Sequence, residues 1–199
     1  MKKIKSNSDF PRIIINSISA KELTGFNIKK TDLREYITGL KQLESNDPDF
    51  IVMVCNTVHL YLNTLRSEIR TEILDLRAEV LATLRKTGVK SMTVLGTPAT
   101  MHGGLYASAG VKNITLKDQE ALRISSAISR FNAGIEREKQ TSLVRSIAKR
   151  YYGRSDAVAA GCTEISLMLQ GSGISYLDTM DVLVEATIRK LEEVKSHGK

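Results

Sequence analysis

The sequence contains no tryptophan, only two cysteines and three prolines, and no long apolar run. The apolar stretches at residues 50–55 and 157–162 are far shorter than the ~20 residues that cross a bilayer, so we expect no membrane association. Two cysteines without a CxxC pair or a Cys/His cluster give no sign of a disulfide framework or a structural zinc site. Free thiols are typical of a reducing compartment, so we expect a cytoplasmic protein without a bound metal.

Aromatic residues are also few, at 5% of the 199 residues, whereas the formal net charge is +7. A basic chain attracts anions in general, from nucleic acids to small acidic metabolites. Here the Lys and Arg residues alternate with Glu and Asp, as in residues 66–72 and 136–139, which is typical of a solvated helix surface. No aromatic and basic stripe is present on which bases would stack, so we expect no nucleic-acid partner.

Short apolar runs alternate with longer segments of helical period, which predicts an α/β fold with a mostly parallel sheet flanked by helices. The apolar stripes predict helices near residues 33–43, 73–84, 122–131, 143–151 and 178–195. Thr31 or Asp32 is the expected cap of the first helix, and Gly88 ends the second. The expected strands are Ile13–Asn16, Phe50–Cys55, Ser91–Gly96, Ala157–Cys162 and Ile174–Leu177.

The chain is long enough for one domain or for two small lobes. If there are two lobes, we expect the boundary near Lys86–Lys90. The first lobe would then hold residues 1–87 together with the final helix, residues 178–199, and the second lobe would hold residues 88–177. The final helix would return from the second lobe to the first.

Both cysteines occur in the same kind of context. Cys55 ends the apolar run VMV and Cys162 ends VAAG, and each is followed by polar residues and a segment of helical period. Each thiol is therefore expected at the carboxyl end of a strand and beside a helix N-terminus, with Asn56 or Thr57 capping the first helix and Thr163 the second. The helix N–H groups favour a thiolate, so we expect a lowered thiol pKa.

A free cysteine at the end of an apolar run is, taken singly, most often a small buried residue. The repeated context adds a second interpretation, because two thiols that face one pocket from opposite sides suit the removal of a proton from one face of a carbon and its replacement on the other. From spacing alone, Cys55 and Cys162 are a candidate pair of reactive thiols.

The motifs CNTVH at Cys55–His59 and GCTEI at Gly161–Ile165 resemble the two catalytic signatures of the aspartate/glutamate racemase superfamily. The loop VLGTPATMHGGLY at residues 94–106 and the late segment YLDTMDVLVEA at residues 176–186 are similar to further family segments. The resemblance covers the chain from about Ile13 to its end. It implies two α/β lobes of pseudo-twofold symmetry, with mostly parallel sheets and an active site between the lobes.

By this resemblance Cys55 and Cys162 are the acid and base thiols. Asn56, Thr57 and Thr163 would bind the α-carboxylate or amino group of the substrate. Glu164 would either hydrogen-bond near the second thiol or serve the helix dipole as a favourable charge. The resemblance also implies substrate contacts for further residues, each of which has a turn or capping role as its alternative: Asn16, Thr97 and Thr100. His59 matches the motif as well, with packing in a helix as its alternative.

Family members ordinarily begin with a strand and a glycine-rich turn resembling IGIIGGMGP, followed by a helix, and these elements are absent here. We therefore expect a shortened first lobe that lacks this strand-helix unit and leaves a sheet edge and an apolar face uncovered. A homodimer is the simplest partner for that surface, with Ile13–Asn16 or the helix Leu33–Leu43 in the contact.

The resemblance predicts a cofactor-independent racemase of aspartate or glutamate that uses two thiols, without metal or pyridoxal phosphate. A related chemistry of the superfamily, hydantoin racemisation or maleate isomerisation, is one alternative. A non-catalytic homologue that binds a small carboxylate or a protein partner is another. The sequence does not place a cation for a substrate side-chain carboxylate.

Overall fold

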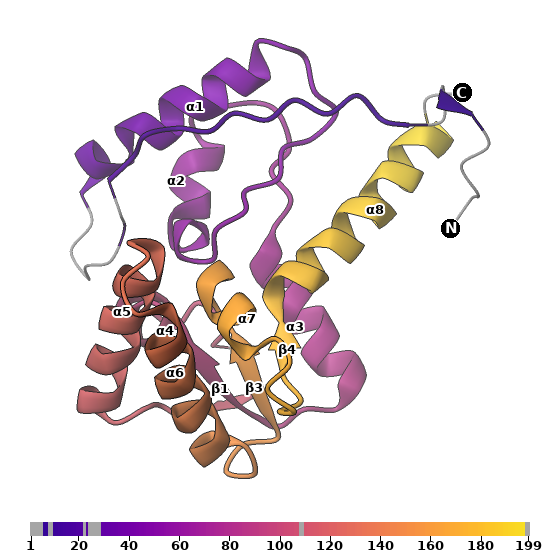
Figure 1. Cartoon of the computed structure of the whole chain (residues 1–199). Coiled ribbons are helices and arrows are strands. Elements are labelled where there is room, and N and C mark those ends of the chain that lie inside the picture. Colours follow the sequence, from indigo (N-terminus) through magenta and orange to yellow (C-terminus); the bar gives the residue numbers. More distant parts are fainter. Residues whose placement is uncertain (1–5, 8–9, 22, 24–28, 108–109, 198–199) are drawn as a thin grey trace.

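In the computed structural model of the chain, residues 6–7, 10–21, 23, 29–107 and 110–197 are described. These residues confirm the predicted α/β fold: a four-stranded, all-parallel sheet of order β2-β1-β3-β4 has helices on both faces (Figure 1). The strands are β1 (Ser91–Leu95), β2 (Lys112–Asn113), β3 (Ala157–Ala160) and β4 (Leu177–Asp178). The helices are η2 (Lys30–Leu33), α1 (Arg34–Glu44), η3 (Thr57–Tyr61), α2 (Leu62–Arg66), α3 (Leu76–Thr87), α4 (Pro98–His102), α5 (Asp118–Asn132), α6 (Arg137–Tyr151), α7 (Thr163–Leu169) and α8 (Thr179–His197).

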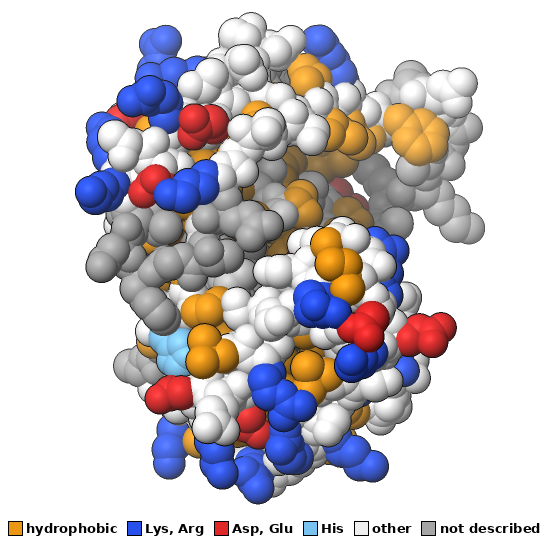
Figure 2. Space-filling model, turned by 60° about the vertical axis from the view of Figure 1, so that its left-hand side comes forward, with side chains coloured by type: hydrophobic (Ala, Val, Ile, Leu, Met, Phe, Trp, Pro, Cys, Tyr) orange, Lys and Arg blue, Asp and Glu red, His pale blue; other side chains and the backbone are white. Residues whose placement is uncertain are grey.

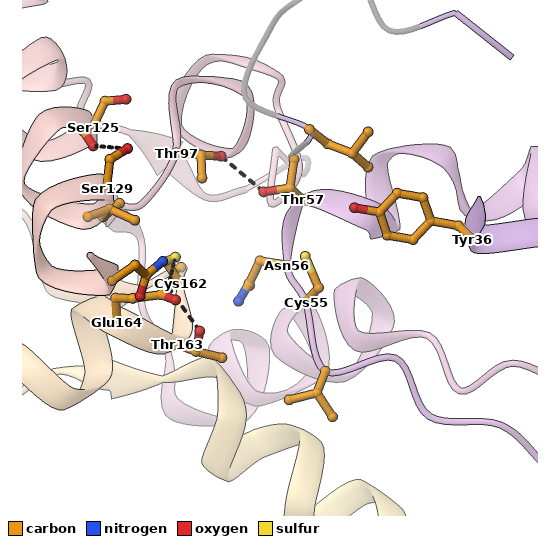
Figure 3. Close-up of a pocket in the computed structure, with 15 residues that line it drawn as sticks. Tyr36, Cys55, Asn56, Thr57, Thr97, Ser125, Ser129, Cys162, Thr163 and Glu164 are labelled. Atoms are coloured by element: carbon orange, nitrogen blue, oxygen red, sulfur yellow. Dashed lines mark hydrogen bonds between the residues drawn. The ribbon is translucent and has the colours of Figure 1, made fainter. Parts of the chain in front are cut away.

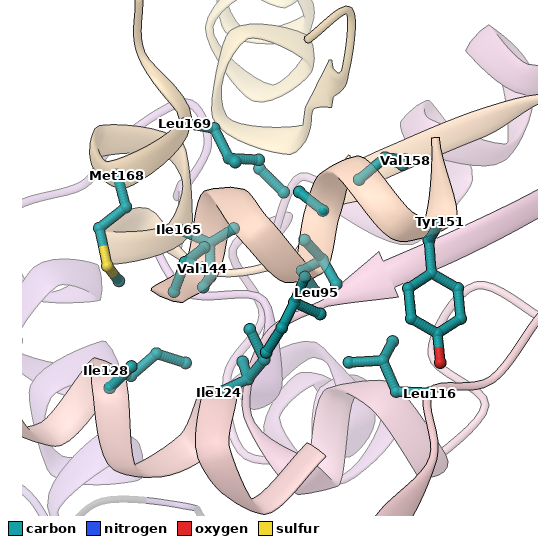
Figure 4. Packing of buried hydrophobic residues seen from close by; sticks show 14 of the residues in the cluster. Leu95, Leu116, Ile124, Ile128, Val144, Tyr151, Val158, Ile165, Met168 and Leu169 are labelled. Carbon is teal, nitrogen blue, oxygen red and sulfur yellow. The ribbon is translucent and has the colours of Figure 1, made fainter. Parts of the chain in front are cut away.

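The side chains of the two central strands alternate between the faces of the sheet, as the pleat of a strand requires. Val158 and Ala160 of β3 join Leu95 of β1 in a core cluster with α5, α6 and α7 (Figure 4). Ala159 and Val94 point to the other face and pack with residues of α3 and α8. Because both faces of the sheet are covered, these strands appear in the sequence as continuous apolar runs.

The part of the chain before α3 has a core of its own, centred on the fully buried Leu62, Leu65 and Ile73. We predicted a strand over Phe50–Cys55, and this prediction is wrong in its extent. Only Ile51 pairs, in an isolated parallel bridge to Ile73, with the N–H of Ile51 bonded to the carbonyl of Glu72. The rest of the segment is extended and leads directly to the first cysteine.

The predicted strand Ile13–Asn16 is also wrong. The segment is extended and runs alongside α1 (Figure 1), but it forms no ladder with another described strand. Asn16 instead donates from Nδ2 to the carbonyl of Gly39 at 3.1 Å, and Ile13 and Ile15 are 74% and 87% exposed. An apolar run becomes a strand only where another backbone lies beside it to accept its hydrogen bonds, and a helix occupies that place here.

Two details of the predicted helices need correction. Thr31 and Asp32 do not cap α1, because they lie within η2, where Asp32 accepts from the N–H of Lys29 at 2.9 Å. In α5, the helix expected near residues 122–131, the apolar Leu122 does not belong to the buried face, whereas Ile128 does. Leu122 is 68% exposed, and the buried residues of the helix are Ala121, Ile124, Ala127 and Ile128.

The other predicted helices are present, but their starts differ from the prediction: α3 begins at Leu76 rather than near residue 73, and α6 begins at Arg137 rather than near residue 143. Asp75 caps α3 by accepting from the N–H groups of Arg77 and Ala78, and Gly88 ends that helix in the left-handed conformation, at φ 72°. The predicted strand Ile174–Leu177 reduces to β4, which begins at Leu177. In the structure, residues of α3 and α8 pack together against the sheet. The division of the chain into two lobes near residue 88 stays a prediction.

The surface carries charges of both signs. Figure 2 shows blue Lys and Arg side chains with red Asp and Glu among them over both ends of the visible face. Several form ion pairs, such as Lys30 with Glu68 at 2.7 Å and Arg150 with Glu120 at 3.0 Å. No helix among the described residues is both long enough and apolar enough to cross a membrane.

Candidate active site

Both cysteines line one cavity of about 180 Å³. Cys162 is the N-cap of α7; it directly follows Gly161 and lies two residues after the end of β3. Cys55 lies two residues before η3. Gly161 allows the ends of β1 and β3 to approach closely, since a Cβ there would lie 2.7 Å from Val94 Cγ1. The carboxyl end of the sheet thus opens directly into the cavity, as in other open α/β sheets.

The two thiols lie on opposite sides of this cavity (Figure 3). The side chain of Asn56 points into the space between them. Their electrostatic coupling agrees with this arrangement, because the charge of a Cys55 thiolate contributes to raising the pKa of Cys162. A small molecule that enters the cavity would meet one thiol on each side.

Cys55 is held through its backbone by His59. His59 is fully buried, and its Nδ1 donates to the carbonyl oxygen of Cys55 at 2.7 Å. Burial raises the pKa of the Cys55 thiol, while the N–H groups of Val58 and Thr57 lower it by a smaller amount. Burial also lowers the pKa of His59, so the imidazole is neutral near pH 7 and acts as a support for the Cys55 backbone.

Cys162 is paired with a carboxylate. Its Sγ donates to Glu164 Oε2 at 2.6 Å, and the hydroxyl of Thr163 donates to the same oxygen at 2.9 Å. Burial raises the pKa of the Glu164 carboxyl, but hydrogen bonds from Cys162, its own N–H and Thr163 outweigh burial and hold the pKa below its usual range. Glu164 is therefore ionised, with the Cys162 thiol as one of its donors.

The expectation of lowered thiol pKa values is wrong. Burial strongly raises the pKa of Cys162, and the negative charge and hydrogen bond of Glu164 raise it further. The helix N–H groups act in the predicted direction at Cys55, but removal from water is the larger effect at both thiols. Both thiols are therefore protonated near pH 7 until something in the cavity stabilises a thiolate.

Three threonine hydroxyls form a closed triangle beside the thiols. Thr57 Oγ1 lies 3.0 Å from Thr97 Oγ1 and 2.9 Å from Thr100 Oγ1, and the last two are 3.1 Å apart. Thr57 and Thr97 line the cavity, whereas Thr100 stands behind them. Hydroxyls rotate to suit a partner, so this triangle is able to turn a donor toward an anion in the cavity.

Asn56 links segments that are distant in the sequence. It is 2% exposed, its Oδ1 accepts from the hydroxyl of Tyr106, and its Nδ2 donates to Thr179 Oγ1 at 3.0 Å. Thr179 in turn donates to the carbonyl of Ala160 at the end of β3. An asparagine amide carries two N–H groups, so one of them remains for the cavity, toward which Asn56 points in Figure 3.

The structure thus brings together most of the residues singled out in the sequence, but not Asn16. Asn16 lies in a separate surface groove against α1, where its amide bonds Gly39 and Gln42. The caps expected from Asn56, Thr57 and Thr163 are absent as side-chain bonds to the helix N–H groups. The second helix begins at Thr163 with Cys162 as its N-cap.

The sequence reasoning missed one wall of the cavity. Ser125, Ser129 and Asn132 line it from α5, and Tyr36 lines it from α1. Both helices were predicted, but the face that each presents was not. The spacing of the α5 residues, at i, i+4 and i+7, is that of one helix face and was the available signal. Within the described residues, no group of three His, Cys, Asp or Glu side chains is arranged to hold a metal ion.

Comparison with known proteins connects this geometry to racemases. The chain is 22% identical over 186 residues to the broad specificity amino-acid racemase RacX of Bacillus subtilis (strain 168), which covers 90% of this chain and 82% of the relative. It is 28% identical over 187 residues to the glutamate racemase of Aquifex aeolicus (strain VF5), and this alignment covers 87% of this chain and 70% of the relative.

Solved structures of similar proteins share the fold. A putative Asp/Glu racemase from Yersinia pestis superposes with a TM-score of 0.65 at 19% identity, over 80% of this chain and 74% of that one. The aspartate racemase of Picrophilus torridus superposes with a TM-score of 0.66 at 20% identity, over 81% of this chain and 72% of that one. The Asp/Glu/Hydantoin racemase family matches residues 5–187. With most of its length matched, the chain belongs to this family.

Proposed function

We propose that this protein is a cofactor-independent amino-acid racemase in which Cys55 and Cys162 act as the two bases. The observation that supports this most directly is the presence of both thiols on opposite sides of one cavity (Figure 3). Removal of a proton from one face of a carbon and delivery to the other requires two groups placed in this way. We expect the enzyme to work in the cytoplasm, where free thiols stay reduced.

In the proposed reaction the α-carbon lies between the two sulfurs. One cysteine, as thiolate, takes the α-proton, so a C–H bond breaks and an S–H bond forms. The other cysteine, as thiol, gives its proton to the opposite face of the carbanion, so its S–H bond breaks and a C–H bond forms. No electron is gained or lost overall. The reverse reaction exchanges the roles of Cys55 and Cys162.

The raised thiol pKa values fit this reaction once an amino acid is present. The described lining of the cavity contains no cation. The substrate ammonium group would supply one, and an opposite charge within several ångströms favours a thiolate. Glu164 would receive the ammonium group, and the hydroxyls of Thr57, Thr97 and Thr163 would hold the α-carboxylate with the remaining N–H of Asn56. Thr100 would support the threonine triangle from behind.

The substrate side chain is a separate matter from the reaction type. The resemblance predicts aspartate or glutamate, and the proteins named above include a glutamate racemase, an aspartate racemase and a broad-specificity enzyme. The two-base reaction requires only the substituents of the α-carbon. Membership of the family therefore supports the reaction more strongly than it supports any one substrate.

Two measurements on the same samples test the proposal against its alternatives. The purified protein is mixed with amino acids, hydantoins and maleate, and optical rotation or the loss of maleate is followed together with the thermal shift. Inversion of an amino acid is the expected result. Turnover of a hydantoin or maleate alone would indicate another chemistry of the family, and binding without any turnover would indicate a non-catalytic homologue.

We further propose that two copies associate through the extended segment near Ile13. Ile13 and Ile15 point away from the protein and are 74% and 87% exposed, and Phe10 is 58% exposed. Burying these side chains in a specific dimer requires about 1,000 Å² or more of total area. Sedimentation at micromolar concentration is expected to show a dimer that Ile13→Asp together with Ile15→Asp dissociates, and a monomeric parent protein would refute it.

A further inference from the structure

The cavity around the thiols has an unusual charge balance for a site that would bind two carboxylates. Glu164 is the single charged side chain among its described lining residues, and it is negative. The opposite walls are apolar or neutral: Ser125, Ser129 and Asn132 stand on α5, and Leu23, Tyr36 and Val54 on the other side. Nothing in this lining would neutralise a carboxylate at the far end of a substrate.

Several cations that lie close to lining residues in the sequence form ion pairs. Lys21, two residues from Leu23, binds Asp32 at 3.1 Å, with 70% of its side chain exposed. Lys30 and Lys41 share Glu68, at 2.7 and 3.4 Å, and Arg130, next to Ser129 on α5, pairs with Glu136. In the sequence, residues 22 and 24–28, which flank Leu23, include no Lys or Arg.

A substrate side-chain carboxylate would therefore be costly in this cavity. The threonine hydroxyls and the remaining N–H of Asn56 are already used by the α-carboxylate in the proposed arrangement. A second carboxylate would lose water without gaining a cation, and Glu164 in the same lining would repel it. The α5 wall instead carries neutral polar groups, namely the hydroxyls of Ser125 and Ser129 and the amide of Asn132. Ser129 donates to the carbonyl of Ser125, and the Asn132 side chain hydrogen-bonds Glu164. Hydroxyl and amide groups both donate and accept, so this wall suits an uncharged polar group. The cavity volume of about 180 Å³ is below the ~300 Å³ from which drug-sized ligand sites begin, so the side chain should also be small.

We infer that the substrate of this site is an amino acid with a small, uncharged side chain, which the α5 residues Ser125, Ser129 and Asn132 contact, and is neither aspartate nor glutamate. This inference rests on the proposed racemase function and makes it more specific. The α-carbon keeps its place between the thiols, with the ammonium group at Glu164 and the α-carboxylate at the threonine hydroxyls. Specificity then depends on a wall that contributes no charge.

Isosteric substrate pairs isolate the charge of the side chain. Asparagine is compared with aspartate, and glutamine with glutamate, by following α-proton exchange in D₂O with NMR and inversion with optical rotation. We expect kcat/KM for each amide to exceed that of its acid by about tenfold or more, equivalent to about 1.4 kcal/mol. Faster turnover of the acids would overturn the inference while leaving the racemase proposal intact.

A lack of exchange with every amino acid would refute the racemase proposal itself. Binding would then still test the inference, because the thermal shift produced by asparagine is expected to exceed that produced by aspartate. A larger shift with aspartate would overturn the inference. The two proposals therefore fail in distinguishable ways.

A charge placed on the α5 wall provides the second test. Ser129→Arg adds a cation at the cavity, and Ser126→Arg adds the same charge to an exposed position of the same helix outside the lining. We expect Ser129→Arg to raise the aspartate-to-asparagine ratio of kcat/KM by about tenfold and Ser126→Arg to leave it near the parent value. An unchanged ratio in Ser129→Arg would show that this wall does not face the substrate side chain.

Discussion

Replacement of Glu164 by Gln should activate the Cys162 thiol. The carboxylate oxygen lies 2.6 Å from Sγ and raises the pKa of Cys162 by its charge and by accepting the thiol proton. With an effective dielectric constant of about 20 and charges about 3.5 Å apart, the repulsion between carboxylate and thiolate is of order 5 kcal/mol. Solvent at the open side of the cavity reduces this value. We therefore take about 1.4 kcal/mol as the lower bound of the repulsion, which corresponds to a tenfold larger fraction of Cys162 in the thiolate form when the repulsion is removed.

The gain in thiolate is partly offset because a less basic thiolate is a weaker nucleophile, with a Brønsted coefficient of about 0.5. The rate constant for alkylation of Cys162 by iodoacetamide at about pH 7.5 should therefore rise between about threefold and about fiftyfold. The assay is intact-mass spectrometry in a Cys55→Ser background, so that Cys162 is the single reactive thiol.

The matched control places Glu164→Gln in a Cys162→Ser background, where Cys55 alone reacts. Glu164 contributes least among the causes that act on the pKa of Cys55, so we expect a smaller acceleration there. If alkylation of Cys162 is unchanged or slower in Glu164→Gln, then Glu164 does not hold this thiol in its protonated form, and the interpretation of the pair is wrong.

Three further predictions concern stability. Tyr106→Phe leaves the buried Oδ1 of Asn56 without its donor, which should lower the free energy of unfolding by about 1–3 kcal/mol in urea titrations; an unchanged midpoint would contradict the proposed link. Gly161→Ala places a Cβ 2.7 Å from Val94 Cγ1 and should cost about 1–3 kcal/mol, together with much of the activity, and wild-type melting would argue against close contact of the strand ends. Because the pKa of Cys162 is raised on folding, the unfolded thiol, with a pKa of about 8.5, ionises at lower pH than the folded one. The stability that the protonated thiol provides is therefore present below that pH and is lost as the pH rises through it. Melting temperatures should therefore fall less steeply above that pH in Cys162→Ser, and equal slopes would refute the assignment.

The sequence predicted most accurately the strands that are buried on both faces and the helix ends that depend on local backbone geometry. β1 and β3 are buried on both faces of the sheet, so that a plain apolar run was enough to find them. The end of α3 at Gly88 was equally local, since it depends on the backbone within one turn. The cap at Asp75 was not predicted. The common pocket of the two cysteines followed from their matching positions near strand ends and helix starts.

The sequence failed where the outcome depends on a partner. Ile13–Asn16 has the composition of a strand, but a strand also needs a neighbouring backbone, and α1 lies there instead. The face that α5 buries, and with it the wall of Ser125 and Ser129, depends on what the helix packs against. The thiol pKa values rise because burial outweighs the helix N–H groups, and the depth of burial cannot be calculated from the order of residues.

The two-base assignment is tested most directly by proton exchange at the α-carbon in D₂O, measured separately for each enantiomer of a turned-over amino acid with the parent protein, Cys55→Ser and Cys162→Ser. A hydroxyl is a far weaker acid and base than a thiol near neutral pH, so we expect neither variant to invert the substrate. Each should retain at most the exchange of one enantiomer, and the two variants should retain opposite ones. Inversion at a near-normal rate by either variant would contradict the account.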